Sequence, residues 1–456
     1  MRRSPSLSTV LAAAVVAACG HGLRPGAASA GDDGTWQAWL VLGPVVEAAR
    51  HHTSGPIAAG LADASKLLAK GKVRAADARL ARLASAGVDP WVLVARADLV
   101  AFYFTTCIKG VAFRLEDTRP GTAPPVGARQ RIDGEDARVR PGDVSVEALL
   151  SGVERAVASG IDELAVQGKM ARARLTAYAS ACPANEQVRA RAQAVMRADL
   201  AELAASGRLA PDLAFMWAGL QMNEYSAAAA RPFLHEAHRG GFDDPSLPLL
   251  LAIAERDAGD PKAARSWAEK ARARFAAAGD RAMEAEAEFL LGTIAQGWGR
   301  PSAAAAHFRR ALELDPYHVQ AVLSQATLVL RTDGEAAAVV YLARVVADRF
   351  APVAWDEPTR RAVVDFGEGL VLAAGDEPAL VQALRDAFLL DVDAAEDPAS
   401  RGARYFFAST LDARLAEYER ARGHALLARQ ELAQSDVDLD LSVDELIESL
   451  PAGDGP

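Results

Sequence analysis

Few patterns in this chain could do chemistry, and the first is a pair of histidines. His235 and His238 lie three positions apart in a segment expected to be helical, so both rings could reach one metal ion. No third ligand is evident beside them, and Glu236 points elsewhere on a helix. A solvated helix face is therefore the better interpretation, and we predict no metal site.

Alternating aspartates near the C-terminus form the second pattern. Asp436, Asp438 and Asp440 have the spacing of the first ligands of a calcium loop. Such a loop needs Gly at its sixth position and Glu at its twelfth, where this chain has Leu441 and Ile447. The chain also lacks a G-x-x-x-x-G-K-[ST] phosphate loop and a G-x-S-x-G nucleophile elbow. We therefore predict no cofactor and no catalytic residue.

The amino terminus points to covalent modification of a cysteine. Arg2 and Arg3 precede an apolar run at residues 10–18, which is typical of a signal peptide over residues 1–18. The run is too short to span a bilayer as a stable helix. Residues 16–19, Val-Ala-Ala-Cys, resemble a bacterial lipobox. This resemblance implies cleavage before Cys19 and a diacylglyceryl group on its sulfur. An ordinary signal peptide with an incidental cysteine is the alternative.

The residues after the cysteine are those of a tether. Gly20, rather than Asp, follows Cys19, and in lipoproteins this usually permits transfer to the outer membrane. We expect a protein that is lipid-anchored in the bacterial envelope and faces the periplasm. Residues 19–34 are rich in Gly, Ala, Ser and Asp, which is typical of a flexible linker.

Two further cysteines, Cys107 and Cys182, would share this oxidising compartment, and both lie beside expected helix ends. A disulfide between them is therefore possible. Two separate buried thiols are the alternative, because sequence alone does not give the Cα separation that a disulfide needs.

The composition limits the partners. The formal net charge of the 456 residues is −10, which disfavours nucleic acid, where Lys and Arg must replace counterions. It also disfavours anionic membrane surfaces, so we expect membrane contact through the lipid anchor only. Hydrophobic residues make up 51% and aromatic residues only 6%. Ala is the main contributor to the apolar content, which favours closely packed helices and an all-α fold.

Residues 285–316 are the clearest structural unit. They predict two short helices separated at Gly299 and closed by Pro316. Small residues such as Gly292 and Ala304 let the two helices approach closely, and Phe308 fills the space between them. Such a hairpin cannot bury its apolar faces alone, so it requires stacked neighbours.

This unit closely resembles a tetratricopeptide repeat (TPR). The matching positions are Leu291, Gly292, Ala295, Gly299, Ala304, Phe308, Ala311 and Pro316. The resemblance implies a right-handed solenoid of stacked helical hairpins that binds proteins or peptides. Terminal repeats of such arrays are expected to be atypical.

The pattern of small residues extends through much of the chain. Residues 35–114 form an N-terminal helical region with one TPR-like unit, in which Pro44 is expected to divide a helix over residues 35–50. A Pro- and Gly-rich loop occupies residues 115–143, and a helical array follows over residues 144–432. Its clearest units are residues 245–276, 285–316 and 319–350, and its last helix pair is expected to break near Gly423.

Residues 433–456 form an acidic tail without Lys or Arg. Ser442 and Glu445 predict a capping box at the start of a short helix. Apolar residues on one side of that helix could dock on the solenoid or present a peptide to a partner.

The resemblance also implies a binding surface, because the first helix of each repeat lines the concave groove in this family. The matching positions are Leu249, Ile253, Arg256, Glu286, Phe289, Thr293, Gln296, Gln320, Leu323, Thr327 and Arg331. Apolar and hydrogen-bonding side chains are mixed there, as in protein interfaces. The family's carboxylate clamp needs Lys and Asn where this chain has Phe289 and Thr293, so an acidic chaperone tail is not the expected ligand. Alternatively, several of these side chains simply pack against neighbouring helices.

Together these features predict a non-catalytic scaffold or adaptor lipoprotein that binds an envelope protein or peptide. Self-association is also open, because exposed solenoid ends can stack. An envelope enzyme or solute-binding protein, with a pocket formed by residues 115–143, is the alternative. Scattered catalytic residues leave no local signature.

Overall fold

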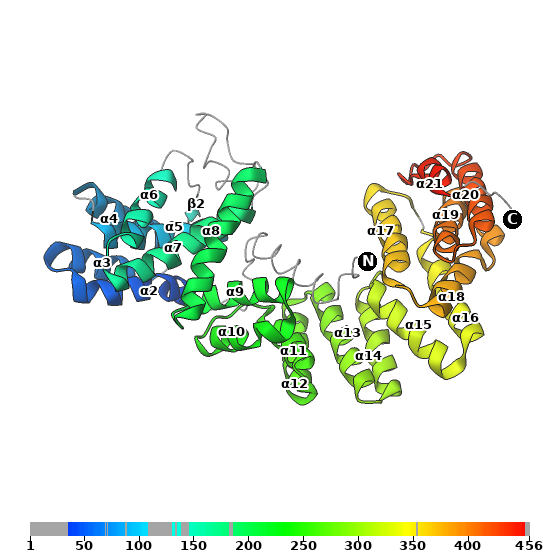
Figure 1. Cartoon of the computed structure of the whole chain (residues 1–456), viewed down its shortest axis with the longest axis horizontal. Coiled ribbons are helices and arrows are strands. Elements are labelled where there is room, and N and C mark those ends of the chain that lie inside the picture. Colours follow the sequence, from blue (N-terminus) through cyan, green and yellow to red (C-terminus); the bar gives the residue numbers. More distant parts are fainter. Residues whose placement is uncertain are drawn as a thin grey trace. The chain divides into compact units, whose positions relative to one another are not determined.

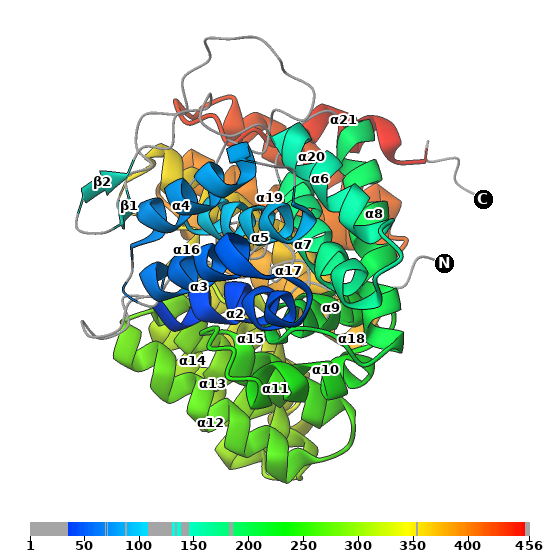
Figure 2. The same cartoon turned by 90° about the vertical axis from the view of Figure 1, so that its left-hand side faces the viewer.

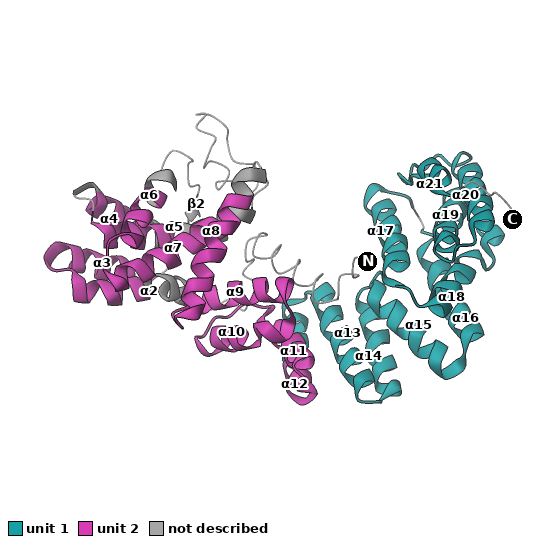
Figure 3. Ribbon diagram, viewed as in Figure 1, with its two compact units in different colours: residues 1–4, 268–456 teal, residues 5–267 magenta. Residues whose placement is uncertain are grey.

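The computed structural model describes residues 35–107 except 69, 71, 87 and 88, then 130–132, 135–137, 146–181, and 186–451 except 353. The chain divides into two compact units (Figures 1 and 3). Unit 2 comprises Pro5–Trp267, and unit 1 comprises Ala268–Pro456 together with Met1–Ser4. Each unit has its own core.

Unit 2 is built mainly from helices. In chain order they are α2 (Thr35–His52), α3 (Gly55–Leu68), α4 (Val73–Ala86), α5 (Pro90–Cys107), α6 (Val146–Val157), α7 (Asp162–Ala181), α8 (Glu186–Ala205), α9 (Pro211–Glu224), α10 (Ala227–Arg239) and α11 (Leu247–Asp257). Helix α12 (Pro261–Ala278) begins in unit 2 and ends in unit 1. Helix α5 packs against α2, α4, α6 and α7, which places it at the centre of the N-terminal helices (Figure 2).

The predicted loop of residues 115–143 contains a short antiparallel pair of strands. Strand β1 (Gln130–Ile132) pairs with β2 (Glu135–Ala137), with Arg131 opposite Asp136. The other residues of that segment lie outside the described part of the chain.

Unit 1 continues the pattern of helical hairpins. Its helices are α13 (Arg281–Gly297), α14 (Pro301–Leu314), α15 (Val319–Asp333), α16 (Glu335–Arg349), α17 (Glu357–Ala373), α18 (Pro378–Leu389), α19 (Pro398–Arg414), α20 (Tyr418–Leu432) and α21 (Val443–Ser449), with a short 3-10 helix η2 (Val392–Ala394). First helices of successive hairpins are neighbours, because α15 packs against α17 and α17 against α19. The predicted all-α architecture of stacked hairpins is confirmed.

The hairpin of α13 and α14 shows how local sequence sets the fold. Asp280 caps α13 by accepting a hydrogen bond from the Met283 N–H at 3.1 Å. Gly299 ends the turn with φ +66°, a conformation that favours glycine. Gly292 lies so close to α14 that an added Cβ would be 2.5 Å from Phe308 Cε1. The predicted pairing of a small residue with a filling aromatic is confirmed.

Aromatic side chains fill the C-terminal half of unit 1. Phe350 meets Phe388 edge to face at 5.4 Å between ring centroids, and meets Phe407 at 5.8 Å. Both geometries are favourable for aromatic pairs. Gly367 leaves room for the Phe407 ring, because an added Cβ there would overlap it. The glycine–aromatic contact of α13 and α14 thus recurs between α17 and α19.

The division of the first helix at Pro44 was predicted wrongly. Helix α2 continues through Pro44 without interruption. Proline removes one backbone hydrogen bond and disfavours a helix interior. The residues that follow it, Val45, Val46, Ala48 and Ala49, are buried in the core of unit 2. Their burial holds the second half of the helix in line with the first.

Two local features near the C-terminus also differ from expectation. Gly423 does not break a helix but lies inside α20, and the turn comes at Ala416, which has φ +60°. Ser442 begins α21 without a side-chain capping bond, so the predicted capping box is wrong. Its hydroxyl does not reach the helix because the chain enters α21 with ψ 61° at Ser442 rather than in an extended conformation.

The membrane and cysteine predictions fall largely outside the described residues. Cys19 and Cys182 are not described, and of Cys107 only the helical backbone at the end of α5 is described. Across the part of the chain that the structure covers, no helix combines the length and apolar character needed to cross a bilayer.

Candidate functional site

The predicted groove residues fall into a buried set and an accessible set. Leu249, Ile253, Phe289 and Leu323 are each at most 5% exposed. Their side chains lie in the helix packing, as the alternative interpretation held, so they support the surface without forming it. The six half-buried residues are Arg256, Glu286, Thr293, Gln296, Gln320 and Thr327, and Arg331 is exposed.

The accessible residues of unit 1 come from two helices. Glu286, Thr293 and Gln296 follow one another at helical spacing on α13. Gln320, Thr327 and Arg331 do the same on α15. Each set therefore shares one face of its helix. Arg256 belongs to α11 in unit 2, where its Nε donates to Asp257 Oδ1 at 2.8 Å.

His318 connects the two helices of this candidate site, and sequence reasoning missed it. Its Nδ1 accepts a hydrogen bond from the Ala321 N–H at 3.3 Å and so caps α15. Its ring packs against Phe289 at 5.0 Å between centroids. The buried Nε2 has no hydrogen-bond partner and lies 3.6 Å from Glu286 Oε1. An Nε2–H in this position faces the accessible carboxylate of α13. The only sequence signal was its place directly before an expected helix start.

The face of α13 and α15 offers hydrogen-bonding groups rather than reactive ones. Its accessible side chains are a carboxylate, two primary amides, two hydroxyls and one guanidinium. Thr293 Oγ1 donates to the Leu290 carbonyl of its own helix at 2.8 Å, which leaves an oxygen lone pair for a ligand. Such a surface can hold the backbone and polar side chains of a peptide.

A second set of polar contacts joins successive hairpins. Glu288 of α13 is buried and accepts a bond from Arg272 of α12 at 3.4 Å, and its Oε2 lies 2.7 Å from His307 Nδ1 of α14. Burial raises the pKa of Glu288, but the bonds and charges of His307 and Arg272 outweigh burial and hold that pKa below its usual value. The contacts therefore favour the ionised carboxylate.

The same arrangement recurs at the C-terminal end of unit 1. The buried Asp412 of α19 lies 3.3 Å from Arg385 Nη1 of α18 and 2.6 Å from His424 Nδ1 of α20. The Arg385 guanidinium also donates to Glu417 at 2.8 Å. In both places a buried carboxylate lies on the first helix of a hairpin. An arginine from the preceding hairpin and a histidine from the second helix of the same hairpin hold it. These contacts fix neighbouring helices to one another.

The histidine pair singled out in the sequence belongs to a related contact. His235 Nε2 of α10 lies 2.6 Å from Oε1 of the buried Glu255 of α11, and Arg231 Nε lies 2.9 Å from the other oxygen. His238 packs edge to face against Trp267 at 4.9 Å. The expectation of a wholly solvated face is thus wrong for His235. Among described residues, no group of three or more His, Cys, Asp or Glu is placed to hold a metal ion.

Unit 2 contains a more deeply buried charge cluster. Arg174 of α7 donates to Asp98 of α5 at 2.8 Å and to Asp212 of α9 at 2.7 and 3.0 Å. Asp98 is fully buried, and its Oδ2 has no hydrogen-bond partner. Burial therefore raises the pKa of Asp98 to about 6 despite the nearby guanidinium. Burial lowers the pKa of Arg174, but its two carboxylates outweigh burial and raise it.

The acidic tail docks on unit 1, which was one of its two predicted roles. Leu439, Val443 and Leu450 are buried, and Leu439 joins the core that contains the Phe350 cluster. Helix α21 packs against α20. The tail is thus part of the structure as far as Pro451.

These features define an α-helical repeat protein. Within unit 1, hairpins stack in chain order, with small residues where two helices cross and large apolar residues beside them. Residues 245–316, which include α11 to α14, match the model of the tetratricopeptide repeat family. That region contains two of the three units that the sequence resemblance had identified.

Comparisons with other proteins show only general likeness. No curated protein matches the chain. The crystal structure of the P58(IPK) TPR domain is 13% identical, covers 86% of this chain and 97% of its own, and has a TM-score of 0.21. A human IFIT1 dimer with m7Gppp-AAAA is 14% identical, covers 94% of this chain and 88% of its own, and has a TM-score of 0.25. Likeness at these levels carries no inference about function.

Proposed function

We propose that this protein is a non-catalytic scaffold or adaptor that binds an extended segment of a partner protein on the face of α13 and α15. The proposal rests on the division of that face into buried apolar side chains and accessible polar ones. Phe289 and Leu323 are buried and fix the two helices, while Glu286, Gln296, Gln320 and the residues that follow them leave hydrogen-bonding groups accessible.

Several features support binding rather than chemistry. Protein interfaces combine a rigid apolar base with polar groups that set orientation. A peptide in extended conformation has unpaired backbone N–H and C=O groups that amides, hydroxyls and carboxylates can satisfy. Glu286 adds an accessible carboxylate acceptor, and the buried His318 Nε2 lies 3.6 Å behind it. Residues 245–316, which include α13 but not α15, match the tetratricopeptide repeat family, a type of unit that commonly binds proteins, and this match supports the role.

We further propose that the protein acts in the bacterial cell envelope, held to the outer membrane by lipid on Cys19 and facing the periplasm. The signal-like residues 1–18 and the lipobox-like residues 16–19 support this location. Acyl chains contribute about 0.8 kcal/mol for each buried CH₂, so more than one chain anchors stably. The partner is accordingly an envelope protein or peptide.

Site-specific photocrosslinking in whole cells tests the binding face. A photoreactive amino acid replaces Gln296 on α13 or Thr327 on α15, and the matched control replaces Val340, which is 57% exposed on α16. We expect one or a few envelope proteins to crosslink at the first two positions and not at the control. If an abundant, anchored bait captures no protein at either position, the proposal fails. An enzyme or solute-binding protein that uses residues 115–143 would then be favoured.

Metabolic labelling tests the anchor separately. Cells fed a palmitate analogue should label the wild-type chain and not the Cys19→Ser variant. The Cys107→Ser variant serves as the matched control, because it also removes one thiol, and should remain labelled. Equal labelling of wild type and the Cys19→Ser variant would contradict lipidation at this residue.

A further inference from the structure

Exposed and inward-facing residues alternate strictly along the docked tail. From Asp436 to Val443 the exposed positions are Asp436, Asp438, Asp440 and Ser442, and the buried or half-buried positions between them are Val437, Leu439, Leu441 and Val443. Alternation with a period of two is that of an extended peptide with one face on an apolar surface. The segment therefore docks as an extended peptide ligand would as far as Leu439, and the backbone then turns at Asp440, where φ is +52°.

An apolar groove of unit 1 receives the inward side chains. Leu439 belongs to the core cluster that includes Phe366 and Phe407, and Val443 belongs to a smaller cluster with Val392 and Tyr405. The groove is therefore formed by helices α17 and α19 and by the segment around η2, and α20 borders it. Because these helices are not part of the tail, the groove would remain if the tail were removed.

The polar contacts between the tail and the helices are few and mostly accessible. Arg360 Nη1 of α17 donates to the Asp438 carbonyl at 3.1 Å, and Arg422 of α20 donates to the Pro451 carbonyl at 3.0 Å. Arg429 lies 3.5 Å from Asp444, and both side chains are mostly exposed. Exposed ion pairs of this kind stabilise by only about 0–1 kcal/mol. The three arginines also give the groove a positive border.

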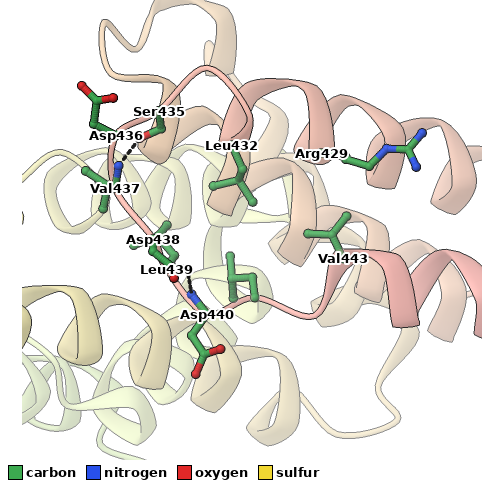
Figure 4. Close-up of a pocket in the computed structure, with 10 residues that line it drawn as sticks. Arg429, Leu432, Ser435, Asp436, Val437, Asp438, Leu439, Asp440 and Val443 are labelled. Carbon is green, nitrogen blue, oxygen red and sulfur yellow. Dashed lines mark hydrogen bonds between the residues drawn. The ribbon is translucent and has the colours of Figure 1, made fainter.

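The tail is also not closely packed along its whole length. Two of its backbone N–H groups bond within the tail, Val437 to Ser435 Oγ at 3.0 Å and Asp440 to Asp438 Oδ1 at 2.9 Å. A pocket of about 340 Å³ remains between the tail and the side chains of Arg429 and Leu432 (Figure 4).

We propose that residues 435–451 are a self-docked ligand, and that the groove beneath them binds a partner's extended peptide in which acidic and aliphatic residues alternate. The apolar floor accepts the aliphatic side chains, and Arg360, Arg422 and Arg429 favour the acidic ones. While attached, the tail competes at an effective concentration of about millimolar. It therefore lowers the apparent affinity for the partner and selects peptides that outcompete it. This surface is separate from the face of α13 and α15.

Fluorescence anisotropy with a labelled synthetic peptide of residues 435–451 tests the proposal. The proteins are the full chain, a chain ending at Gln434, and the full chain with Leu439→Asp, which removes the deepest inward contact of the tail. Leu372→Asp is the matched control, because Leu372 is 68% exposed on α17. We expect the peptide to bind the truncated and Leu439→Asp chains at least about tenfold more tightly than the wild-type and Leu372→Asp chains. A peptide carrying Asp at position 439 should not bind.

Other outcomes would overturn the proposal. If the truncated and Leu439→Asp chains keep their helical circular dichroism but do not bind the peptide, the groove is not a binding site. If both variants unfold, the tail is an integral part of the core. If the full chain binds the peptide equally well, the tail does not compete. Light scattering that shows a dimer of the full chain, lost on truncation, would assign the groove to the tail of a second copy instead. None of these results depends on crosslinking at Gln296 or Thr327.

Discussion

The α13–α14 hairpin of unit 1 and the α5–α7–α9 cluster of unit 2 hold their helices together by different physical means. In the hairpin, Gly292 admits the Phe308 ring, and dispersion and apolar burial act between neighbouring segments. In the cluster, Arg174 joins two carboxylates from other helices inside the core. The first contact tolerates no added volume, and the second tolerates no lost partner. The comparison shows that a tightly packed contact is destabilised by an added group, whereas a buried ion pair is destabilised by a removed one.

Removal of the central cation should have the largest effect. Arg174→Met leaves Asp98 buried without a counter-charge, and breaking a buried ion pair from one side costs about 3–5 kcal/mol. We expect a loss of that size in urea unfolding. The double variant Asp98→Leu/Arg174→Met removes both deeply buried charges and should recover most of the loss. If the double variant is as unstable as the single one, packing by the Arg174 side chain matters more than its charge.

Added volume at the hairpin should have the next largest effect. Gly292→Ala places a methyl group 2.5 Å from Phe308 Cε1, and overpacking of a core costs about 1–3 kcal/mol. Gly297→Ala in the same helix is the matched control, because an added Cβ there meets nothing within 4 Å. It should stabilise by roughly 0.4–1 kcal/mol by restricting the unfolded chain. Equal thermal shifts for the two variants would contradict the close approach of α13 and α14.

The buried cluster should also respond to pH, and in the opposite direction to the hairpin, where the pKa of Glu288 is lowered. The pKa of Asp98 is about 6 in the folded chain and 3.8 in its ordinary state. Between these values the folded chain keeps a proton that the unfolded chain has released. The contribution of Asp98 to stability is therefore largest below about pH 3.8 and falls as pH rises to about 6. Unfolding of wild type compared with Asp98→Asn, measured across this window, should show that slope only in wild type.

The smallest effect should come from matched substitutions at two helix starts, outside both contacts. Ser226 accepts a hydrogen bond from the Ala229 N–H at 3.2 Å and caps α10, whereas Ser442 makes no capping bond at α21. Ser226→Ala should cost about 1 kcal/mol. Ser442→Ala should change stability by less than about 0.5 kcal/mol. A similar loss of stability at both sites would show that Ser442 does cap α21.

Local features of the structure could be predicted because their causes lie close together in the sequence. The turns at Gly299 and Gly279 have positive φ, and pairs of helices occupy residues 247–278, 281–314 and 319–349. Gly423 misled the prediction because a glycine that terminates a helix and one that is tolerated inside it look the same in sequence. The packing of the whole of α20 on α19 decided between them.

The candidate site was predictable only in part. The repeat resemblance placed Glu286, Gln320 and Phe289 together in one groove, but it could not show that Phe289 is buried against His318 while the other two are half-buried. Nor could it pair Asp98 with Arg174, which lie 76 positions apart. The docking of Leu439 was likewise only one of two alternatives.

By itself, the sequence determined the helices, their turns and the small residues at which paired helices meet, because the helical period and the conformational limits of Gly and Pro act over a few residues. Tertiary structure alone decided which side chains of the predicted groove are accessible, which buried carboxylates find a cation, and where the acidic tail docks. Burial and charge pairing depend on groups that distant parts of the chain bring together, and a short stretch of sequence does not contain them.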